Sequence, residues 1–176
     1  MNRGKIVIIT MMVVAIGLAI FAWWNRYSQS QKVLEVWGAD VVLAIRTGDR
    51  AHLLQLQSLA NRAAAENEDR IDVLKNGEKT TLVVVNQQEI TDVPGLIHAR
   101  HHLVHRMGFD WDAPRSATCE PTWPLALRFH EPGTATMLLD FDCKRVYLLE
   151  RDVEVAMRPI IADALFEFIE ESNLQP

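Results

Sequence analysis

The apolar run from Ile6 to Trp24 constrains this chain more than any other feature. Its nineteen residues, IVIITMMVVAIGLAIFAWW, carry no charge and a single hydroxyl group. A helix of this length is roughly 28 Å long, close to the ~30 Å thickness of the hydrocarbon core of a bilayer. We therefore expect residues 6–24 to form a transmembrane helix whose partner is the lipid bilayer.

The end of the run distinguishes an uncleaved anchor from a cleaved signal peptide. Trp23 and Trp24 stand where amphipathic rings lie at the level of the lipid headgroups, so we predict that both are membrane-interface anchors. A signal peptide has an apolar core of about 7–15 residues, followed by small residues at the cleavage site. The longer core favours a signal anchor, but Ile20-Phe21-Ala22 leaves a possible cleavage site and keeps that alternative open.

The flanking charges indicate the orientation of the anchor by a small margin. Arg3 and Lys5 precede the run, whereas Arg26 and Lys32 follow it among nearby carboxylates. The positive-inside rule then favours a cytoplasmic N-terminus. The expected location is a bacterial inner (cytoplasmic) membrane, crossed once, with the C-terminal domain outside the cytoplasm.

Charge and length limit what the remainder can be. Two of the 18 Lys and Arg residues precede the apolar run, which leaves 16 against 23 Asp and Glu, a formal charge of −7. An acidic domain is not expected to bind nucleic acid, because phosphate contacts need a basic face. The expected organisation is a cytoplasmic tail over 1–5, the anchor over 6–24, a polar linker over 25–32 and one domain over 33–176.

Hydrophobic periodicity and turn residues predict the elements of that domain. We expect helices over 33–46, 91–107 and 160–171, strands over 80–85 and 125–130, a strand or strand pair over 136–149, a loop or frayed helix over 61–69, and turns at 76–77 and 131–134. Residues 52–56 suit either a helix or a strand. The continuous apolar character of 80–85 suggests a central strand. The predicted fold class is α+β, with a mostly antiparallel sheet packed by helices after the transmembrane helix.

Four histidines fall on one arc of the helix predicted over 91–107. They are His98, His101, His102 and His105. Pairs with i,i+4 spacing allow two imidazoles to reach one metal ion, so these residues are candidate metal ligands. The missing feature is a third ligand, for which the candidates are Asp110, Asp112, His52 and His130. The alternatives are a plain solvated face and a surface that gains charge below neutral pH.

Three charged residues raise questions that the sequence leaves open. Arg100 falls on the apolar side of the same helix, where it needs either a partner, such as Asp140 or Asp142, or an extended route to water. Asp140 and Asp142 share one strand face, which is typical of a solvated surface and less often of acid–base catalysis.

Cys119 and Cys143 are the only two cysteines. In a hairpin with its turn near Pro132-Gly133, Cys143 lies opposite about residue 122, close enough for a disulfide after a modest bend. An oxidising compartment outside the cytoplasm would allow the bond. Two free buried thiols, or a catalytic or metal-binding thiol, are the alternatives.

Three short motifs carry a resemblance over residues 80–150. They are Cys119-Glu120-Pro121, Ala126-Leu127-Arg128-Phe129 and Asp140-Phe141-Asp142-Cys143, preceded by Glu89-Ile90-Thr91-Asp92 before a helix. This pattern resembles a loosely defined group of small uncharacterised bacterial domains that are membrane-anchored or lipid-attached. Thr122-Trp123 departs from the group, where an Arg-His or Gly-containing turn is more usual. The resemblance implies an α+β hairpin domain and no known activity.

The motif search favours binding over catalysis. The chain has no phosphate loop, dinucleotide fingerprint or nucleophile elbow. We therefore expect no catalytic residue and no cofactor. The expected function is a non-catalytic binding or structural module on the extracytoplasmic face, with an unknown protein partner. The alternative is a small metal-dependent enzyme, or a metal-binding protein, that uses the His98–His105 helix face.

Overall fold

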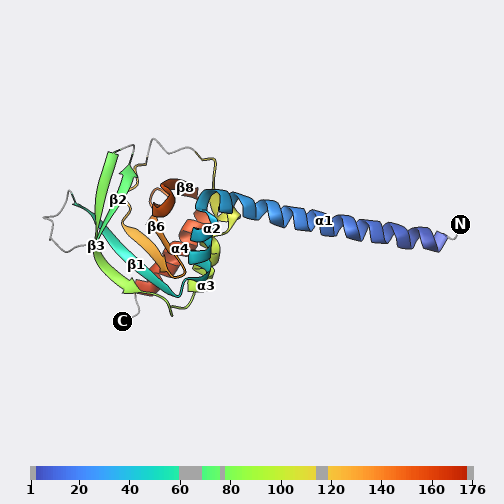
Figure 1. The fold of residues 1–176 in the computed structure, drawn as a ribbon, viewed down its shortest axis with the longest axis horizontal. Coiled ribbons are helices and arrows are strands. Elements are labelled where there is room, and N and C mark those ends of the chain that lie inside the picture. Colours follow the sequence, from blue (N-terminus) through green and yellow to red (C-terminus); the bar gives the residue numbers. More distant parts are fainter. Residues whose placement is uncertain (1–2, 60–68, 76–77, 114–118, 174–176) are drawn as a thin grey trace.

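A long helix leads into the domain in the computed structural model, which describes residues 3–59, 69–75, 78–113 and 119–173. Helix α1 spans Arg3–Trp37 and leaves the domain as a free rod (Figure 1). Within the described residues, Ile6–Asn25 is a helical segment long and apolar enough to cross a membrane, and none of it is buried against the protein. The stretch expected as a linker, 25–32, is part of this helix.

Gly38 separates α1 from the next helix. Its backbone angles, φ 83° and ψ 153°, lie in a region that is essentially restricted to glycine. The chain therefore turns after Trp37, and α2 begins anew and spans Ala39–Thr47. The single helix expected over 33–46 is thus two helices, because the glycine allows a backbone conformation that a helix cannot contain.

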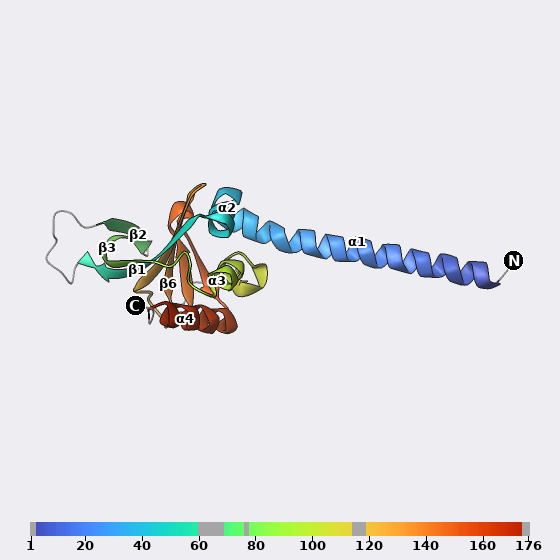
Figure 2. The same ribbon diagram turned by 90° about the horizontal axis from the view of Figure 1, so that it is seen from below.

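In the described part of the chain, eight antiparallel strands form one sheet in the order β2-β3-β1-β5-β6-β7-β8-β4. Their bounds are β1 Arg50–Ser58, β2 Arg70–Lys75, β3 Glu78–Glu89, β4 Phe109–Asp110, β5 Leu125–His130, β6 Thr134–Asp140, β7 Arg145–Leu148 and β8 Val153–Met157. The predicted α+β class with a mostly antiparallel sheet is confirmed. Strands β2 and β3 lie at the end of the domain that is remote from α1 (Figures 1 and 2).

The register resolves the ambiguous segments. Residues 52–56 belong to β1, which pairs with both β3 and β5 in the middle of the sheet. Residues 80–85 belong to β3, which is one place from the edge rather than central. The segment 136–149 is a strand pair, β6 and β7. Although both residues have odd numbers, Met137 of β6 lies in the main core and Tyr147 of β7 lies in the smaller core on the opposite face of the sheet.

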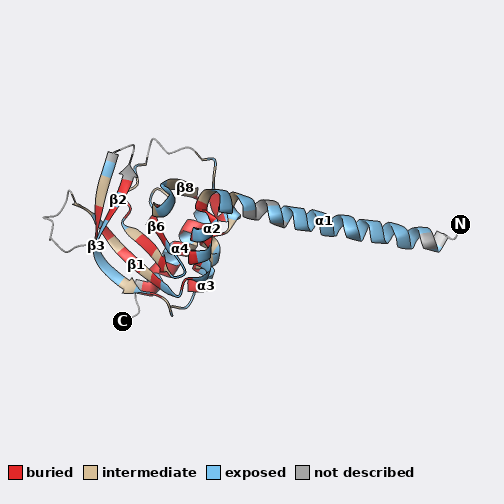
Figure 3. Cartoon of the chain, viewed as in Figure 1, coloured by how far each residue is buried: buried red, intermediate tan, exposed pale blue. Residues whose placement is uncertain are grey.

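Three helices cover one face of the sheet. They are α2, α3 (Leu96–Leu103) and α4 (Pro159–Asn173), and their buried apolar residues pack with the odd-numbered residues of β1, β5 and β6 in the main core. The buried residues, red in Figure 3, include this core. In both ribbon views α2 and α3 lie toward the free end of α1, whereas α4 runs along the underside of the sheet in Figure 2.

The opposite face of the sheet carries a second, smaller core. It consists of Leu54, Leu56, Ile71, Val73, Leu82, Trp123, Ala126, Leu138 and Tyr147. Trp123 comes from the segment before β5 and covers this face in place of a helix. Its ring centroid lies 5.7 Å from that of Tyr147. The packing of the second core therefore depends on the contacts that hold the Trp123 segment against the sheet.

The remaining sequence predictions fall partly outside the described residues. The turn at 76–77 and most of the loop at 61–69 lie there. The last predicted helix is confirmed as α4. The helix predicted to start at Thr91 or Asp92 and to end near Met107 is shorter. It begins after Gly95, which has φ 91°, and ends at Leu103.

Candidate functional site

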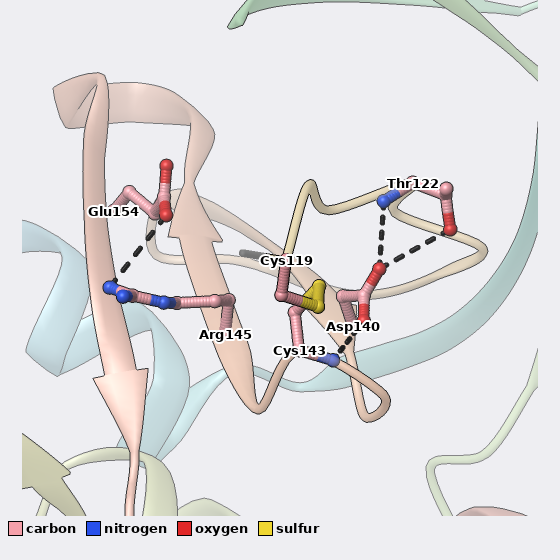
Figure 4. The surroundings of a disulfide bond; sticks show 6 residues. All are labelled: Cys119, Thr122, Asp140, Cys143, Arg145 and Glu154. Carbon is pink, nitrogen blue, oxygen red and sulfur yellow. Dashed lines mark hydrogen bonds and ion pairs between the residues drawn. A yellow bond between two sulfur atoms is a disulfide. The ribbon is translucent and has the colours of Figure 1, made fainter. Parts of the chain in front are cut away.

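A disulfide bond fixes the segment that covers the second core. Cys119 and Cys143 are bonded with a Cα–Cα distance of 5.6 Å, as the hairpin register suggested (Figure 4). In that register Leu125 pairs with Leu139, which places Cys143 opposite the Cys119–Thr122 segment. Among the described residues there is no free cysteine. The bond joins the start of the covering segment to the turn after β6.

Asp140 adds a second tie between the same two segments. Its buried carboxylate accepts hydrogen bonds from the Thr122 amide at 2.7 Å, the Thr122 hydroxyl at 3.3 Å and the Cys143 amide at 2.8 Å (Figure 4). The expected solvated pair of Asp140 and Asp142 is wrong, because Asp140 is only 3% exposed while Asp142 lies in the exposed turn. This carboxylate has a structural role.

The far end of the covering segment is tied to the sheet. The amide of Leu56 donates a 2.8 Å hydrogen bond to the carbonyl oxygen of Pro124, next to the β1–β5 ladder. Between the two tied ends, Trp123 has φ 52° and turns its side chain into the second core. A short segment held at both ends in this way forms a fixed wall above the sheet.

This wall and the sheet enclose a groove of about 250 Å³. Leu56, Val73, Thr80 and Leu82 line it from three neighbouring strands, Pro121–Pro124 form the wall, and Gln57 and Ser58 complete the lining. The lining that the described residues provide has no titratable side chain. Its volume is below the roughly 300–1,000 Å³ of typical small-molecule pockets. It suits one or two apolar side chains of a larger partner.

The histidines of α3 do not converge on this groove. His98, His101 and His102 lie on α3, but His105 follows the end of the helix, where its Nδ1 accepts a 3.2 Å hydrogen bond from the Met107 amide. The rings of His101 and His105 are stacked, with centroids 5.1 Å apart. Burial and the neighbouring imidazoles lower the pKa of His102. Within the described part of the chain, no three His, Cys, Asp or Glu side chains are grouped to hold a metal ion.

His98 lines a hollow on the domain surface. This depression of about 590 Å³ lies between the end of α2 and the start of α3, and its polar lining includes Asp49, Asp92 and Arg100. Arg100 is already engaged there, since its guanidinium donates to the carbonyl oxygen of Gly48 at 2.6 Å and to that of Arg46 at 3.4 Å. Among the described residues, the hollow therefore brings no group of metal-ligating side chains together with His98.

Arg100 thus has a partner other than the expected Asp140 or Asp142. Its guanidinium caps the carbonyl end of α2, where a positive charge also complements the helix dipole. It lies over the ring of Phe129, at 5.4 Å from the centroid. The sequence could place Arg100 on the inner side of α3, but the end of α2 becomes its neighbour only through tertiary packing.

His52 and His130, two of the candidate third ligands, instead lie together with Arg128 on β1 and β5. The rings of His52 and His130 meet edge to face with centroids 5.3 Å apart, and Arg128 pairs directly opposite His52. Burial lowers the pKa of His130, and the neighbouring His52, Arg128 and Arg50 lower it further. Arg128 also forms an ion pair of 2.7 Å with Asp69. In the sequence, His52, Arg128 and His130 alternate with the core residues of their strands, which could have predicted that all three share one face of the sheet.

Comparison with known proteins found no matching family model, no matching curated protein and no matching solved structure. The resemblance of residues 80–150 to small bacterial membrane-anchored domains therefore stays an expectation. The features that bear on function are the exposed apolar helix α1, the disulfide-tied wall and the groove.

Proposed function

We propose that this chain is a single-pass membrane protein whose domain is a non-catalytic binding module outside the cytoplasm. Support for the anchor comes from the exposure of α1. The large apolar side chains between Ile6 and Trp24 are 46–69% exposed in the chain itself. Water would solvate so large an apolar surface poorly, whereas the interior of a bilayer matches it. Continuity of α1 with the domain through Trp37 makes the same helix both anchor and stalk.

Placement of the domain outside the cytoplasm is supported by two independent features. The charges that flank the span favour a cytoplasmic N-terminus by a small margin. A disulfide persists in an oxidising compartment and is rare in the cytosol. Both agree with a bacterial inner membrane and an extracytoplasmic domain.

The groove is the single observation that carries the binding role. Its lining is apolar apart from hydroxyl and amide groups, and its wall is fixed by a disulfide, a buried carboxylate and a main-chain hydrogen bond. A pre-formed, rigid groove lowers the entropic cost of binding. Beside it β2 ends the sheet, so its outer edge can pair with an extended chain. We therefore infer that the partner is an extended protein segment that places an apolar side chain in the groove.

The arrangement of the elements leaves this groove accessible. The strands that line the groove lie at the end of the domain remote from α1 (Figures 1 and 2). With α1 in a bilayer, the groove would face away from the membrane. The alternative role, a metal-dependent enzyme or metal-binding protein built on His98–His105, has less support because the imidazoles do not converge with a third ligand among the described residues.

Selection of peptides from a random library tests the binding role. The full chain, held in phospholipid nanodiscs, should enrich peptides that share an apolar or aromatic residue within an extended sequence. Thr80→Trp would fill the groove from β3 and should weaken the binding of an enriched peptide at least about tenfold, since a burial worth about 1.4 kcal/mol is lost. Thr134→Trp is the matched control, because Thr134 is exposed at the opposite end of the β5–β6 hairpin. Equal binding by the parent chain and Thr80→Trp would contradict the assignment.

A further inference from the structure

Helix α3 has an exposed face that its packing leaves without a protein partner among the described residues. Leu96, Ala99 and Leu103 point into the main core. On the outer side, Ile97 is 81% exposed and His101 is also exposed. After the helix, the short 3₁₀ turn η2 (Arg106–Gly108) adds exposed Arg106 and Met107. These four residues, Ile97, His101, Arg106 and Met107, are called the α3 patch below.

The α3 patch is continuous across the end of the helix. The stacked rings of His101 and His105 connect α3 to the following turn. The His105 ring in turn accepts the hydrogen bond from the Met107 amide. The carbonyl oxygen of Arg106 accepts a 2.9 Å bond from the indole of Trp111, which fixes η2 against the aromatic cluster at the end of α1. The patch therefore has a defined position relative to α1.

That position is on the side of the domain from which α1 leaves. In both ribbon views α3 and the segment after it lie on the side of the sheet toward the free end of α1 (Figures 1 and 2). Because Leu96, Ala99 and Leu103 lie in the main core, the exposed residues of α3 face away from that core. With α1 inserted as a span, α3 and the turn after it lie on the bilayer side of the domain.

The length of the exposed stalk sets how close the near end of the domain comes to the membrane. The candidate span ends at Asn25, and α1 becomes buried in the domain at Val33. Eight residues of helix advance about 12 Å. The headgroup region occupies about 5–8 Å of that distance on each side of the bilayer. The remaining gap is shorter than an Arg side chain and a Debye length of about 8 Å, and helix tilt would reduce it.

The composition of this region suits a lipid surface. The domain as a whole is acidic, yet the residues from Val93 to Gly108 include no Asp or Glu. The nearest carboxylates along the chain are Asp92 and Asp110. Arg106 offers a permanent positive charge, and Ile97 and Met107 offer apolar side chains that can enter the interface. Anionic headgroups attract basic residues that lie near the membrane surface.

From these observations we propose that the α3 patch contacts the anionic lipid headgroups of the membrane that holds α1. The contact depends on the proposed anchoring of the chain. It would fix the domain against the bilayer at two places, through α1 and through the patch. The groove would then be held in one orientation, facing away from the membrane.

Site-specific photo-crosslinking to lipid tests this contact. A benzophenone amino acid is placed singly at Ile97, Met107, Ile20 and Val85 of the full chain, in nanodiscs of phosphatidylcholine with phosphatidylglycerol. Ile20 lies in the candidate span, and Val85 is an exposed aliphatic residue of β3 at the remote end of the domain. Lipid adducts are expected at positions 97, 107 and 20, and not at 85.

The outcomes separate this proposal from the proposed anchor. Adducts at position 20 without adducts at 97 and 107 would overturn the lipid contact and leave the anchor intact. The absence of adducts at position 20 would overturn the anchor and the contact that depends on it. Adducts of equal yield at 85 and 97 would show that the contact is not specific to the patch, and would overturn it too.

A charge reversal tests the electrostatic part. With the crosslinker at position 97, Arg106→Glu should lower the adduct yield roughly fivefold in nanodiscs that contain phosphatidylglycerol. Lys79→Glu is the matched control, because Lys79 is exposed on β3. An equal yield in the parent and Arg106→Glu chains would overturn the role of anionic headgroups.

Discussion

The indole nitrogen of Trp37 donates a 3.1 Å hydrogen bond to the carbonyl oxygen of Leu103. This bond joins the last turn of α1 to the last turn of α3. The Trp37 side chain is fully buried, and its ring meets those of Phe109 and Trp111 edge on, at 5.5 and 5.4 Å. The junction makes α1 a rigid extension of the domain rather than a tether, so a membrane that holds α1 also orients the groove.

Trp37→Phe should destabilise the domain by about 1–2 kcal/mol, because the Leu103 carbonyl loses its donor inside the core. Chemical denaturation of the full chain in detergent micelles, followed by circular dichroism, measures the change. Trp24→Phe is the control, since Trp24 lies in the candidate span and contacts no part of the core. Equal midpoints for the parent and Trp37→Phe would show that the hydrogen bond adds nothing to stability.

Replacement of both cysteines by serine should lower the free energy of unfolding by about 3–4 kcal/mol, because the closed loop spans 24 residues. Peptide binding in the groove should weaken in parallel, since the wall at Pro121–Pro124 loses one of its ties. The same denaturation experiment, with and without reductant, measures the loss. Reductant should shift the parent chain and leave the double variant unchanged. A parent chain that is insensitive to reductant would contradict the stabilising role of the bond.

Asp140→Asn should destabilise the domain by about 1–3 kcal/mol, because an amide cannot accept all the hydrogen bonds that Thr122 and Cys143 donate to the carboxylate. Asp142→Asn is the matched control in the exposed turn, with an expected effect within about 0.5 kcal/mol. Thermal unfolding of the two variants compares them directly. Similar losses from both substitutions would argue against the buried role of Asp140.

Acidification should destabilise the folded domain through His130. Its pKa is lowered in the folded state, so the unfolded chain takes up a proton at a higher pH than the folded chain does. Stability should therefore be constant near neutral pH and fall as the pH drops below the usual histidine value of about 6.5. Urea midpoints measured from pH 7.5 to 5 should decline less steeply in His130→Gln. Identical slopes would exclude His130 as a source of the pH dependence.

Gly38→Ala should cost about 1–3 kcal/mol, because φ 83° with ψ 153° is strained for any side chain. The added Cβ would also fall 2.1 Å from Nη2 of Arg151 and 2.7 Å from a carboxylate oxygen of Asp40. Those two groups form an ion pair between α2 and the turn before β8. Gly17→Ala, in open space within the span, should leave the unfolding midpoint unchanged. A midpoint equal to that of the parent chain would show that α1 and α2 can meet without the glycine.

Local patterns were sufficient to predict much of the fold. The apolar run before Asn25, the β-branched residues of β3, the turn at Glu131–Thr134 and the amphipathic stripe of α4 each specify an element within a few neighbouring residues. The hairpin register followed from its turn and placed Cys143 near Cys119. Where one short stretch determined both the element and its pairing, the prediction agreed with the structure.

The helix predicted over 33–46 failed for a local reason, the backbone conformation of Gly38. The predictions for Arg100, Asp140 and the groove failed because they depend on contacts between distant segments. The guanidinium of Arg100 donates a hydrogen bond to the carbonyl oxygen of Gly48 at the end of α2, and the two residues are 52 positions apart in sequence. Asp140 is buried because the covering segment folds over it. In the sequence, its position in the strand is the same as that of a residue that faces solvent, so the pattern could not predict the burial. The groove combines β1, β2, β3 and the Trp123 segment, so no single motif could reveal it.

The most direct test of the account is the protease accessibility of a tag at the C-terminus in spheroplasts that express the full chain. An anchored chain with its domain outside the cytoplasm predicts that added protease removes the tag from intact spheroplasts, while a cytosolic marker survives. A tag that stays protected until the membrane is dissolved would contradict this placement, and with it the proposed exposure of the groove to an extracytoplasmic partner.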